Sequence, residues 1–549
     1  MKSFVVQQAW RILWCPLRRG NYMTVNEAPP AAGTREWIGL GVMCLATLLV
    51  ASDAFVLLQA LPHIGAGLGA DGIEQLWVAD IYGIMLGGFL MTMGGLGDRI
   101  GRRKLLLIGA TAFGAASLLA AFSTSPEMLI AARGLLGVAG ATLAPSTLGL
   151  IRNMFRDPRQ MGVAVGIWAS FFTIGAVVGL MVGGILLANF WWGSVFLMAP
   201  IVAAILVVVG RVVLPEFKNP DAPRPDYFSS VLSLAAILPA VWGVKELSRD
   251  GWQVLPVLAI LLGVAFGVVF VRRQKKLTNP LLDLSLFKLR NFSVPLLALF
   301  LQAAFTGTVL LFIMQHFQLV EGLTAWQAGL ALVPGMVLSS LFSPIAAVLA
   351  RRFRPAYLIA CGEVIVIVGL LLIILSGASG NPALLIIGFA IWSIGGTPLL
   401  AVGMTLIVGS APPEKAGSAS SMPQISNEVG TAIGVATVGS LGVAIYHSQV
   451  VDKLPTQLPA EAADAASQSI ANAMGVAMAL PPEVAGTVLA AARTAYTSSM
   501  QVVTGLTAAV LVGVIALVLT RLRKVRPLGQ EELAVEPEQE ETAVKETVA

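Results

Sequence analysis

Among the ionisable side chains inside long apolar segments of the sequence are Asp53, Asp80, Arg133, Glu363 and Glu428. A charged side chain at the centre of a membrane-spanning helix costs about 2.5 to 3.5 kcal/mol, so such a residue must be compensated or useful. A titratable acid can alternate between holding a proton and holding a cation. These five residues are therefore predicted to carry proton coupling or substrate binding.

The elements that hold these residues are predicted to be membrane-spanning helices. Of the 549 residues, 56% are hydrophobic and only 12% are charged, which is the composition of a polytopic membrane protein. About fourteen apolar segments approach the ~20 residues needed to span a bilayer, so we expect an all-α membrane protein. The segments are Trp37–Leu61, Gln75–Leu96, Leu105–Phe122, Met128–Leu150, Gly162–Leu187, Gly193–Leu214, Val231–Leu247, Val254–Val271, Val294–Phe317, Ala328–Leu349, Tyr357–Leu375, Ala383–Val408, Met422–Ile445 and Met500–Leu519.

Lysine and arginine gather in alternate connections between these segments. Placing both termini in the cytoplasm puts roughly thirty of the 35 basic residues on that side, as the positive-inside rule requires. The predicted location is the cytoplasmic (inner) membrane, crossed many times. The net charge of +5 belongs to these connections, so we expect contact with lipid and no nucleic-acid partner.

The order of the segments suggests five parts. A cytoplasmic N-terminal segment (1–36) precedes a six-helix bundle (37–214), and two central helices with cytoplasmic connectors follow (215–292). A second six-helix bundle (293–520) includes an outer loop (447–498), and an acidic cytoplasmic tail (521–549) ends the chain. The alanine-rich outer loop is either a helical hairpin over the outer mouth or a solvated linker.

One connection combines glycines, an acid and several arginines within a few residues. Its residues are Gly94, Asp98, Arg99, Gly101, Arg102 and Arg103. Glycines allow close helix approach, and the carboxylate can cap a helix or form a salt bridge at its end. An ordinary positive-inside loop would explain the arginines but not the aspartate and glycines, so a gating role is predicted.

This spacing matches the loop between the second and third helices of major facilitator transporters. Further similarity lies in Ser52-Asp53, in Gln75–Tyr82, and in the fourth segment with Arg133, Gly137 and Gly140. From about Trp37 to Leu519 the chain resembles the fourteen-helix drug:proton antiporters of the QacA, SmvA and LfrA type.

The resemblance implies two six-helix bundles plus two additional central helices, and export of lipophilic cations such as quaternary ammonium compounds and dyes in exchange for protons. It implies a role in antibiotic resistance and gives Asp53 a coupling role. The glycines of the fifth segment, Gly175, Gly179, Gly183 and Gly184, resemble the family's antiporter signature, although Leu180 replaces its usual proline. By themselves such glycines indicate close helix packing.

The acids and Arg133 are expected to form two groups. Asp53, Asp80 and Arg133 fall in the outer half of the membrane, where two carboxylates would share one guanidinium. Glu363 and Glu428 fall in the inner half. The alternative for the first group is a permanent salt bridge that only holds helices together.

Other functions remain open at this stage. The same fold could export one endogenous metabolite or antibiotic, and a channel is a further alternative. We find no His-metal cluster, hydrolytic dyad or phosphate-binding loop, so we expect no enzyme, no metal and no cofactor. The protein is expected to be a monomer, and the coupling ion is H⁺ or Na⁺.

Overall fold

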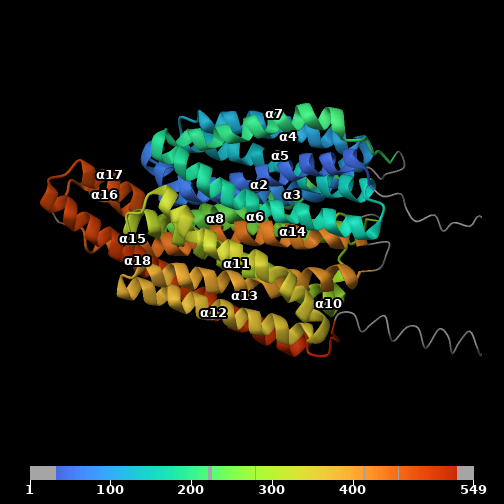
Figure 1. Cartoon of the computed structure of the whole chain (residues 1–549). Coiled ribbons are helices and arrows are strands. Elements are labelled where there is room, and N and C mark those ends of the chain that lie inside the picture. Colours follow the sequence, from blue (N-terminus) through green and yellow to red (C-terminus); the bar gives the residue numbers. More distant parts are fainter. Residues whose placement is uncertain (1–31, 220–224, 278–279, 412–415, 456, 528–549) are drawn as a thin grey trace, which may run out of the picture.

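The chain folds entirely into helices over the residues that the computed structural model describes, which are 32–219, 225–277, 280–411, 416–455 and 457–527. Fourteen helical segments among them are long and apolar enough to cross a membrane, which confirms the expected all-α membrane fold. They run roughly along one common axis (Figure 1). Most of the 1–36 segment and of the acidic tail lies outside the described residues.

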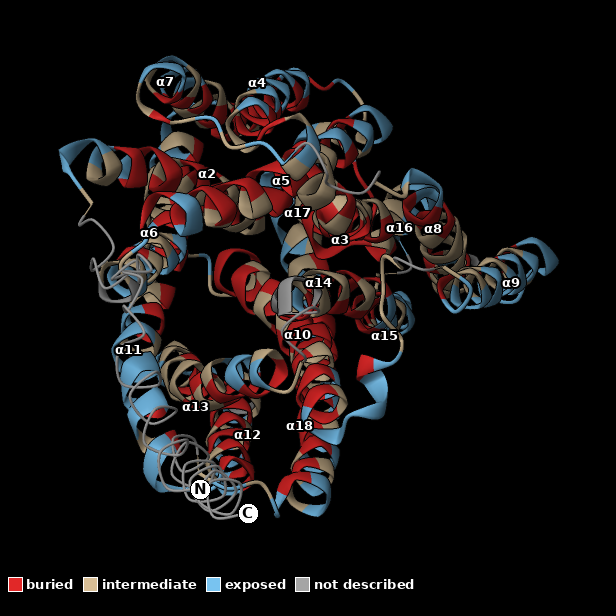
Figure 2. Cartoon of the chain, turned by 90° about the vertical axis from the view of Figure 1, so that its right-hand side faces the viewer, coloured by how far each residue is buried: buried red, intermediate tan, exposed pale blue. Residues whose placement is uncertain are grey.

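The N-terminal half consists of six of these spans. Its helices are α2 (Thr34–Leu68), α3 (Gly72–Ile100), α4 (Arg102–Ala121), α5 (Pro126–Met154), α6 (Pro158–Asn189) and α7 (Met198–Val213), the last preceded by the 3₁₀ turn η1 (Trp192–Leu197). Two additional helices follow, α8 (Tyr227–Asp250) and α9 (Val254–Gln274). α8 packs against α3, whereas α9 lies at the edge of the molecule with most of its surface exposed (Figure 2).

The C-terminal half contains the other six spans. A short 3₁₀ turn, η2 (Leu286–Lys288), precedes it. Its spans are α10 (Arg290–Gln315) with the π turn η3 (His316–Val320), α11 (Ala325–Arg352), α12 (Pro355–Ser379), α13 (Pro382–Gly409), α14 (Ala416–Gly434), which continues through the π turn η5 (Val435–Gly439) into α15 (Ser440–Val451), and α18 (Pro482–Leu522).

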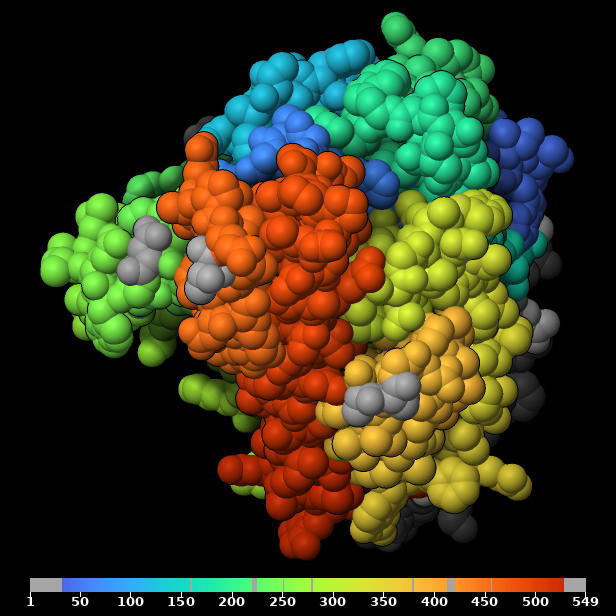
Figure 3. All heavy atoms as spheres, turned by 90° about the vertical axis from the view of Figure 1, so that its left-hand side faces the viewer, coloured from blue at the N-terminus to red at the C-terminus, as the bar shows by residue number. Residues whose placement is uncertain are grey.

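The predicted outer loop is largely helical. Two short helices, α16 (Ala460–Gln468) and α17 (Ile470–Met478), follow α15, and α18 begins at Pro482 rather than at Met500. Figure 3 shows these segments in orange over one end of the molecule. We call this the hairpin end, and we call the opposite end, where α3 meets α4, the loop end.

Local sequence signals set where several helices begin. Asp71 accepts a hydrogen bond from the Glu74 backbone at 2.7 Å, and Glu74 accepts one from the Asp71 backbone at 2.9 Å, so these two residues cap α3 reciprocally. Thr324 and Gln327 form the same arrangement at the start of α11. Gly101 ends α3 at a φ of +114°, a conformation that favours glycine.

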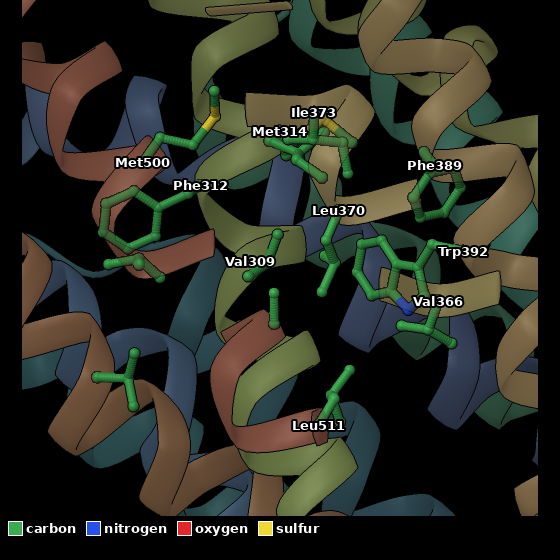
Figure 4. Close-up of a cluster of buried hydrophobic side chains, with 14 of the residues drawn as sticks. Val309, Phe312, Met314, Val366, Leu370, Ile373, Phe389, Trp392, Met500 and Leu511 are labelled. Atoms are coloured by element: carbon green, nitrogen blue, oxygen red, sulfur yellow. The ribbon is translucent and has the colours of Figure 1, made fainter. Parts of the chain in front are cut away.

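Each half has its own apolar core. One buried cluster is formed mostly by α2 to α7 and another mostly by α10 to α18. Figure 4 shows part of the second cluster, to which Phe312 of α10, Leu370 of α12 and Trp392 of α13 belong. The halves meet along two seams, between α3 and α14 and between α6 and α11. Residues on these seams are placed to respond when one half moves against the other.

Candidate functional site

Asp53 and Arg133 form a buried ion pair inside the N-terminal half. Arg133 Nη1 of α5 donates to Asp53 Oδ2 of α2 at 2.5 Å, and the two side chains are only 1% and 3% exposed. Arg133 Nε also donates to the Val78 carbonyl of α3 at 3.3 Å. The guanidinium of Arg133 therefore joins three helices, and its positive charge balances the negative charge of the Asp53 carboxylate.

Tyr82 lies beside this ion pair. The Arg133 guanidinium lies 4.7 Å from the centre of the Tyr82 ring, within reach of a cation–π interaction. The buried hydroxyl of Tyr82 has no hydrogen-bond partner among the described residues. The ring of Tyr82 thus contacts the ion pair, while its hydroxyl can accept or donate a further hydrogen bond.

Asp80 does not share the Arg133 guanidinium, so the expected three-residue cluster is wrong. It pairs instead with Lys245 of α8, whose Nζ lies 2.8 Å from Asp80 Oδ2, and both side chains are fully buried. The same ammonium lies 3.8 Å from the ring centre of Trp77. Lys245 stands within the seventh apolar segment, so the cost of burying a charge could have marked it in the sequence.

Glu428 lies on the seam between α3 and α14. Its Oε1 accepts a hydrogen bond from Gln424 Nε2 at 2.9 Å, one helical turn away. A Cβ added to Gly83 of α3 would lie 3.9 Å from Glu428 Oε2. The side chain is half-buried, and no basic group of the described residues lies within ion-pair distance.

Glu363 occupies a separate place in the C-terminal half. Its fully buried carboxyl on α12 accepts from Gln302 Nε2 of α10 at 2.9 Å, and its second oxygen has no hydrogen-bond partner. No described contact joins it to Glu428. The two acids that the sequence placed in the inner half are therefore distinct groups.

The charged loop fastens α3 and α4 to their neighbours. Asp98 pairs with Arg102 at 2.5 Å, and Arg102 Nη1 donates to the Pro145 carbonyl of α5 at 2.9 Å. A Cβ added to Gly149 would lie 1.4 Å from that guanidinium nitrogen, so the arginine fills the space beside this glycine. Asp98, α3, α4 and α5 are thus linked through one side chain.

Glu216, which sequence reasoning missed, completes the same region. Its carboxylate accepts from the backbone nitrogens of Arg103 and Lys104 at 3.0 and 3.1 Å, at the start of α4. A Cβ added to Gly101 would lie 2.5 Å from Glu216 Oε1. An acid at a helix N-terminus is favourable, but the connection that brings Glu216 there could not be deduced from spacing. No interaction of the Arg99 side chain is described.

The four glycines of α6 face two different partners. Cβ atoms added to Gly175, Gly179 and Gly183 would meet α2, and one added to Gly184 would lie 2.6 Å from the Trp326 Cα of α11. Added to Gly179, it would lie 2.6 Å from the Ser52 carbonyl oxygen, directly beside Asp53. These glycines thus set how closely α6 approaches α2 and α11.

The α6–α11 seam is closed at the hairpin end and open at the loop end. Leu180 and Gly184 are buried against α11. Gly162 and Gly166 lie on the same face of α6, about five turns earlier, and are exposed with no heavy atom within 4 Å of an added Cβ. The α6–α11 seam therefore opens toward the loop end.

Polar contacts also join the halves near the hairpin end. Gln59 Nε2 of α2 donates to the Ala325 carbonyl of α11 at 2.8 Å, and Gln318 Nε2 donates to the Gln59 carbonyl at 3.2 Å. Among the described residues no cluster of three or more metal-ligating side chains is present.

Fold and site together define a membrane transporter. The chain matches the model of the Major Facilitator Superfamily over residues 43–435, and it belongs to that superfamily. It is therefore a multi-pass membrane transporter and not an enzyme. The family resemblance drawn from the sequence is confirmed.

Within the superfamily, the chain is similar to multidrug efflux proteins. It is 42% identical over 467 residues to the multidrug efflux pump LfrA of Mycolicibacterium smegmatis, covering 85% of this chain and 92% of LfrA. It is 35% identical over 473 residues to the methyl viologen resistance protein SmvA of Salmonella typhimurium, covering 84% of this chain and 93% of SmvA.

A solved structure shares the fold alone. The chain superposes with a TM-score of 0.63 on a bacterial homologue of the human lysosomal transporter Spinster in an inward-facing, occupied conformation. The sequence identity is 13%, and the match covers 89% of this chain and 98% of that chain.

Proposed function

We propose that this protein is a proton-coupled antiporter that exports lipophilic cations, such as quaternary ammonium compounds and dyes, across the cytoplasmic membrane. The buried Asp53–Arg133 pair carries the proposal. It places a titratable acid within an otherwise apolar span, beside the glycine seam that α6 forms with α2. An acid in that position can exchange a proton for a cation as the halves rearrange.

The balance of buried charge favours a cationic substrate. Asp53 and Asp80 are each neutralised by one basic residue, whereas Glu428 and Glu363 have only amide partners. A monovalent cation near Glu428 would remove an uncompensated charge. SmvA is named for resistance to methyl viologen, an aromatic dication, and LfrA for multidrug efflux.

We place the loop end and both termini in the cytoplasm, because the basic connections gather there. In this orientation the α6–α11 seam is closed toward the outside and open toward the cytoplasm. A substrate enters from the cytoplasm or inner leaflet. After the protein changes to the outward-open conformation, protons that arrive from outside displace the substrate. Asp98 and Arg102 act on the cytoplasmic gate through α5.

Ethidium uptake into inverted membrane vesicles tests this function. Energised vesicles that contain the protein should accumulate ethidium, and collapse of the pH gradient with nigericin should stop the accumulation. Valinomycin collapses the membrane potential alone, so the uptake lost on its addition is the part that the membrane potential drives. Moving one charge across that potential is worth about 2.3 kcal/mol per 100 mV. Vesicles with Asp53→Asn serve as the matched control.

Two outcomes would overturn the proposal. Uptake that a sodium gradient drives and that nigericin does not stop would identify Na⁺, and not the proton, as the coupling ion. No uptake of any of several cationic dyes, together with export of one neutral or anionic compound, would favour a dedicated metabolite or antibiotic exporter.

A further inference from the structure

The additional helix α8 lies across the seam between the two halves. It packs against α3 of the N-terminal half and against η5 and α15 of the C-terminal half. Figure 2 shows α8 beside α3, with α9 on its outer side. Because α3 and α14 form one of the two seams, α8 must either follow one half or divide its contacts whenever the halves move.

Polar contacts bind α8 to α3 along its length. Lys245 pairs with Asp80 at 2.8 Å in a fully buried environment, and Arg249 pairs with Asp71, just before α3, at 3.1 Å. Closer to the loop end, the hydroxyls of Ser230 and Thr92 form a hydrogen bond. Buried ion pairs resist separation because either charge left alone is strongly unfavourable.

The contact of α8 with the C-terminal half has a different character. Leu234 and Val241 of α8 belong to one apolar cluster with Ile84 of α3, Ala432 of α14 and Ala436 of η5. Alanines present a shallow surface without directional bonds, and a π turn is a local departure from regular α-helix. Ion pairs therefore join α8 to the α3 side, whereas the side chains at its contact with η5 are apolar.

We propose that Lys245 is a positioning residue, which fixes α8 to the N-terminal half so that α8 travels with α3 and slides over η5 and α15 as the halves move. α8 then covers the α3–α14 seam against lipid throughout the transport cycle. The proposal rests on the proposed transport function, since it concerns the movement that transport requires.

Two matched bridges test the proposal in a cysteine-free background. Thr92→Cys with Ser230→Cys joins α8 to α3, and Val241→Cys with Ala436→Cys, bridged by a short bifunctional thiol reagent, joins α8 to the C-terminal half. The first bridge should leave ethidium efflux close to the unbridged rate. The second should lower it about tenfold, with recovery on reduction.

The opposite pattern would overturn the proposal, as would a second bridge without effect. Spin labels provide a readout that needs neither substrate nor proton coupling. Trp252 lies between α8 and α9, Phe122 lies in the N-terminal half and His447 lies in the C-terminal half. The separation between Trp252→Cys and Phe122→Cys should stay constant between conformations, while that between Trp252→Cys and His447→Cys should change. If the proposed proton coupling is wrong, the protein without bridges will already show ethidium efflux that does not depend on the proton gradient.

Charge variants test Lys245 itself. Lys245→Met leaves Asp80 uncompensated and should lower both expression and efflux, whereas Lys245→Arg should retain efflux. The double variant Asp80→Asn with Lys245→Met removes both charges, so it should recover folding but lose efflux rate at unchanged ethidium affinity. A double variant with the wild-type rate would show that the pair has no positioning role.

Discussion

Asp53 differs from the other buried acids because it combines an ion pair with a place beside a helix seam. Its carboxylate meets Arg133 at 2.5 Å, and the neighbouring Ser52 backbone contacts Gly179 of α6. Movement of α6 against α2 would therefore reach Asp53 directly. Asp80 lies in a fixed contact with Lys245, and Glu363 is enclosed within one half.

We expect Asp53→Asn to abolish uphill ethidium efflux and ethidium-induced proton release, because an amide cannot bind and release the proton. Asp53→Glu keeps the titratable group but moves it by one methylene, so it should retain partial activity. Efflux and proton release measured together in proteoliposomes check both expectations.

The control for this prediction addresses folding. Asp53→Asn leaves the Arg133 charge buried without its partner, which costs about 3 to 5 kcal/mol. Adding Arg133→Leu removes that charge, so the double variant should regain thermal stability while coupling stays absent. If Asp53→Asn alone pumps ethidium against a gradient at the wild-type rate, coupling lies elsewhere, and Glu428 is the next candidate.

At the scale of helices, the loop-end contacts of Arg102 depend on the absence of a side chain at position 149. In Gly149→Ala, the new Cβ would displace the Arg102 guanidinium and weaken its contacts with Asp98 and Pro145. The arginine is flexible, so stability should change little. Turnover should fall about fivefold at unchanged ethidium affinity, as in Asp98→Asn.

Binding and transport measured separately check this expectation. Gly162→Ala is the control, because it adds the same methyl group at the loop end where no heavy atom lies within 4 Å. Loss of affinity at normal turnover in Gly149→Ala would place Arg102 in substrate binding and not in gating.

The packing of α6 against α2 leads to another prediction. In Gly179→Ala, the added Cβ would lie 2.6 Å from the Ser52 carbonyl oxygen, a backbone atom that cannot yield unless the helix moves. Overpacking of this kind costs about 1 to 3 kcal/mol. We expect a lower unfolding temperature in detergent together with reduced efflux, since Asp53 adjoins the contact.

Gly166→Ala on the same helix provides the comparison, because its surroundings are open. Equal unfolding temperatures for the two variants would argue against close packing at Gly179. A stable Gly179→Ala protein without efflux would instead assign this glycine a role in movement.

The sequence predicted helices and seams better than it predicted partners. Apolar length identified the fourteen spans, and glycine spacing identified the face of α6 that approaches its neighbours. The partner predicted for Asp80 was wrong, because pairing depends on which helices are neighbours. No periodic pattern in the sequence indicates that α8 lies beside α3. The same holds for Glu216, which reaches the start of α4 through an irregular connection. α18 begins at Pro482, before the apolar segment that starts at Met500, and its first turns are alanine-rich and not strongly apolar.

At the scale of the whole molecule, the two halves are joined at one end and separated at the other. Gln59 and Gln318 make hydrogen bonds between the halves near the hairpin end, while α6 is exposed on its α11 face near the loop end. A transporter that alternates must break the first set of contacts to open the hairpin end. The strength of those contacts therefore sets how the two conformations are populated.

Removal of one such contact gives a quantitative prediction. Gln59→Leu eliminates the bond to the Ala325 carbonyl, worth about 1 kcal/mol, so the population open at the hairpin end should rise about fivefold. Gln501→Leu is the matched control, because Gln501 Nε2 donates to the Ile374 carbonyl at 3.1 Å within the C-terminal half. Spin labels at Phe122→Cys and His447→Cys report the separation of the halves at the hairpin end. Only Gln59→Leu should lengthen it, although both variants lose a similar hydrogen bond. Equal distance distributions in the two variants would mean that Gln59 stabilises the fold without holding the halves together.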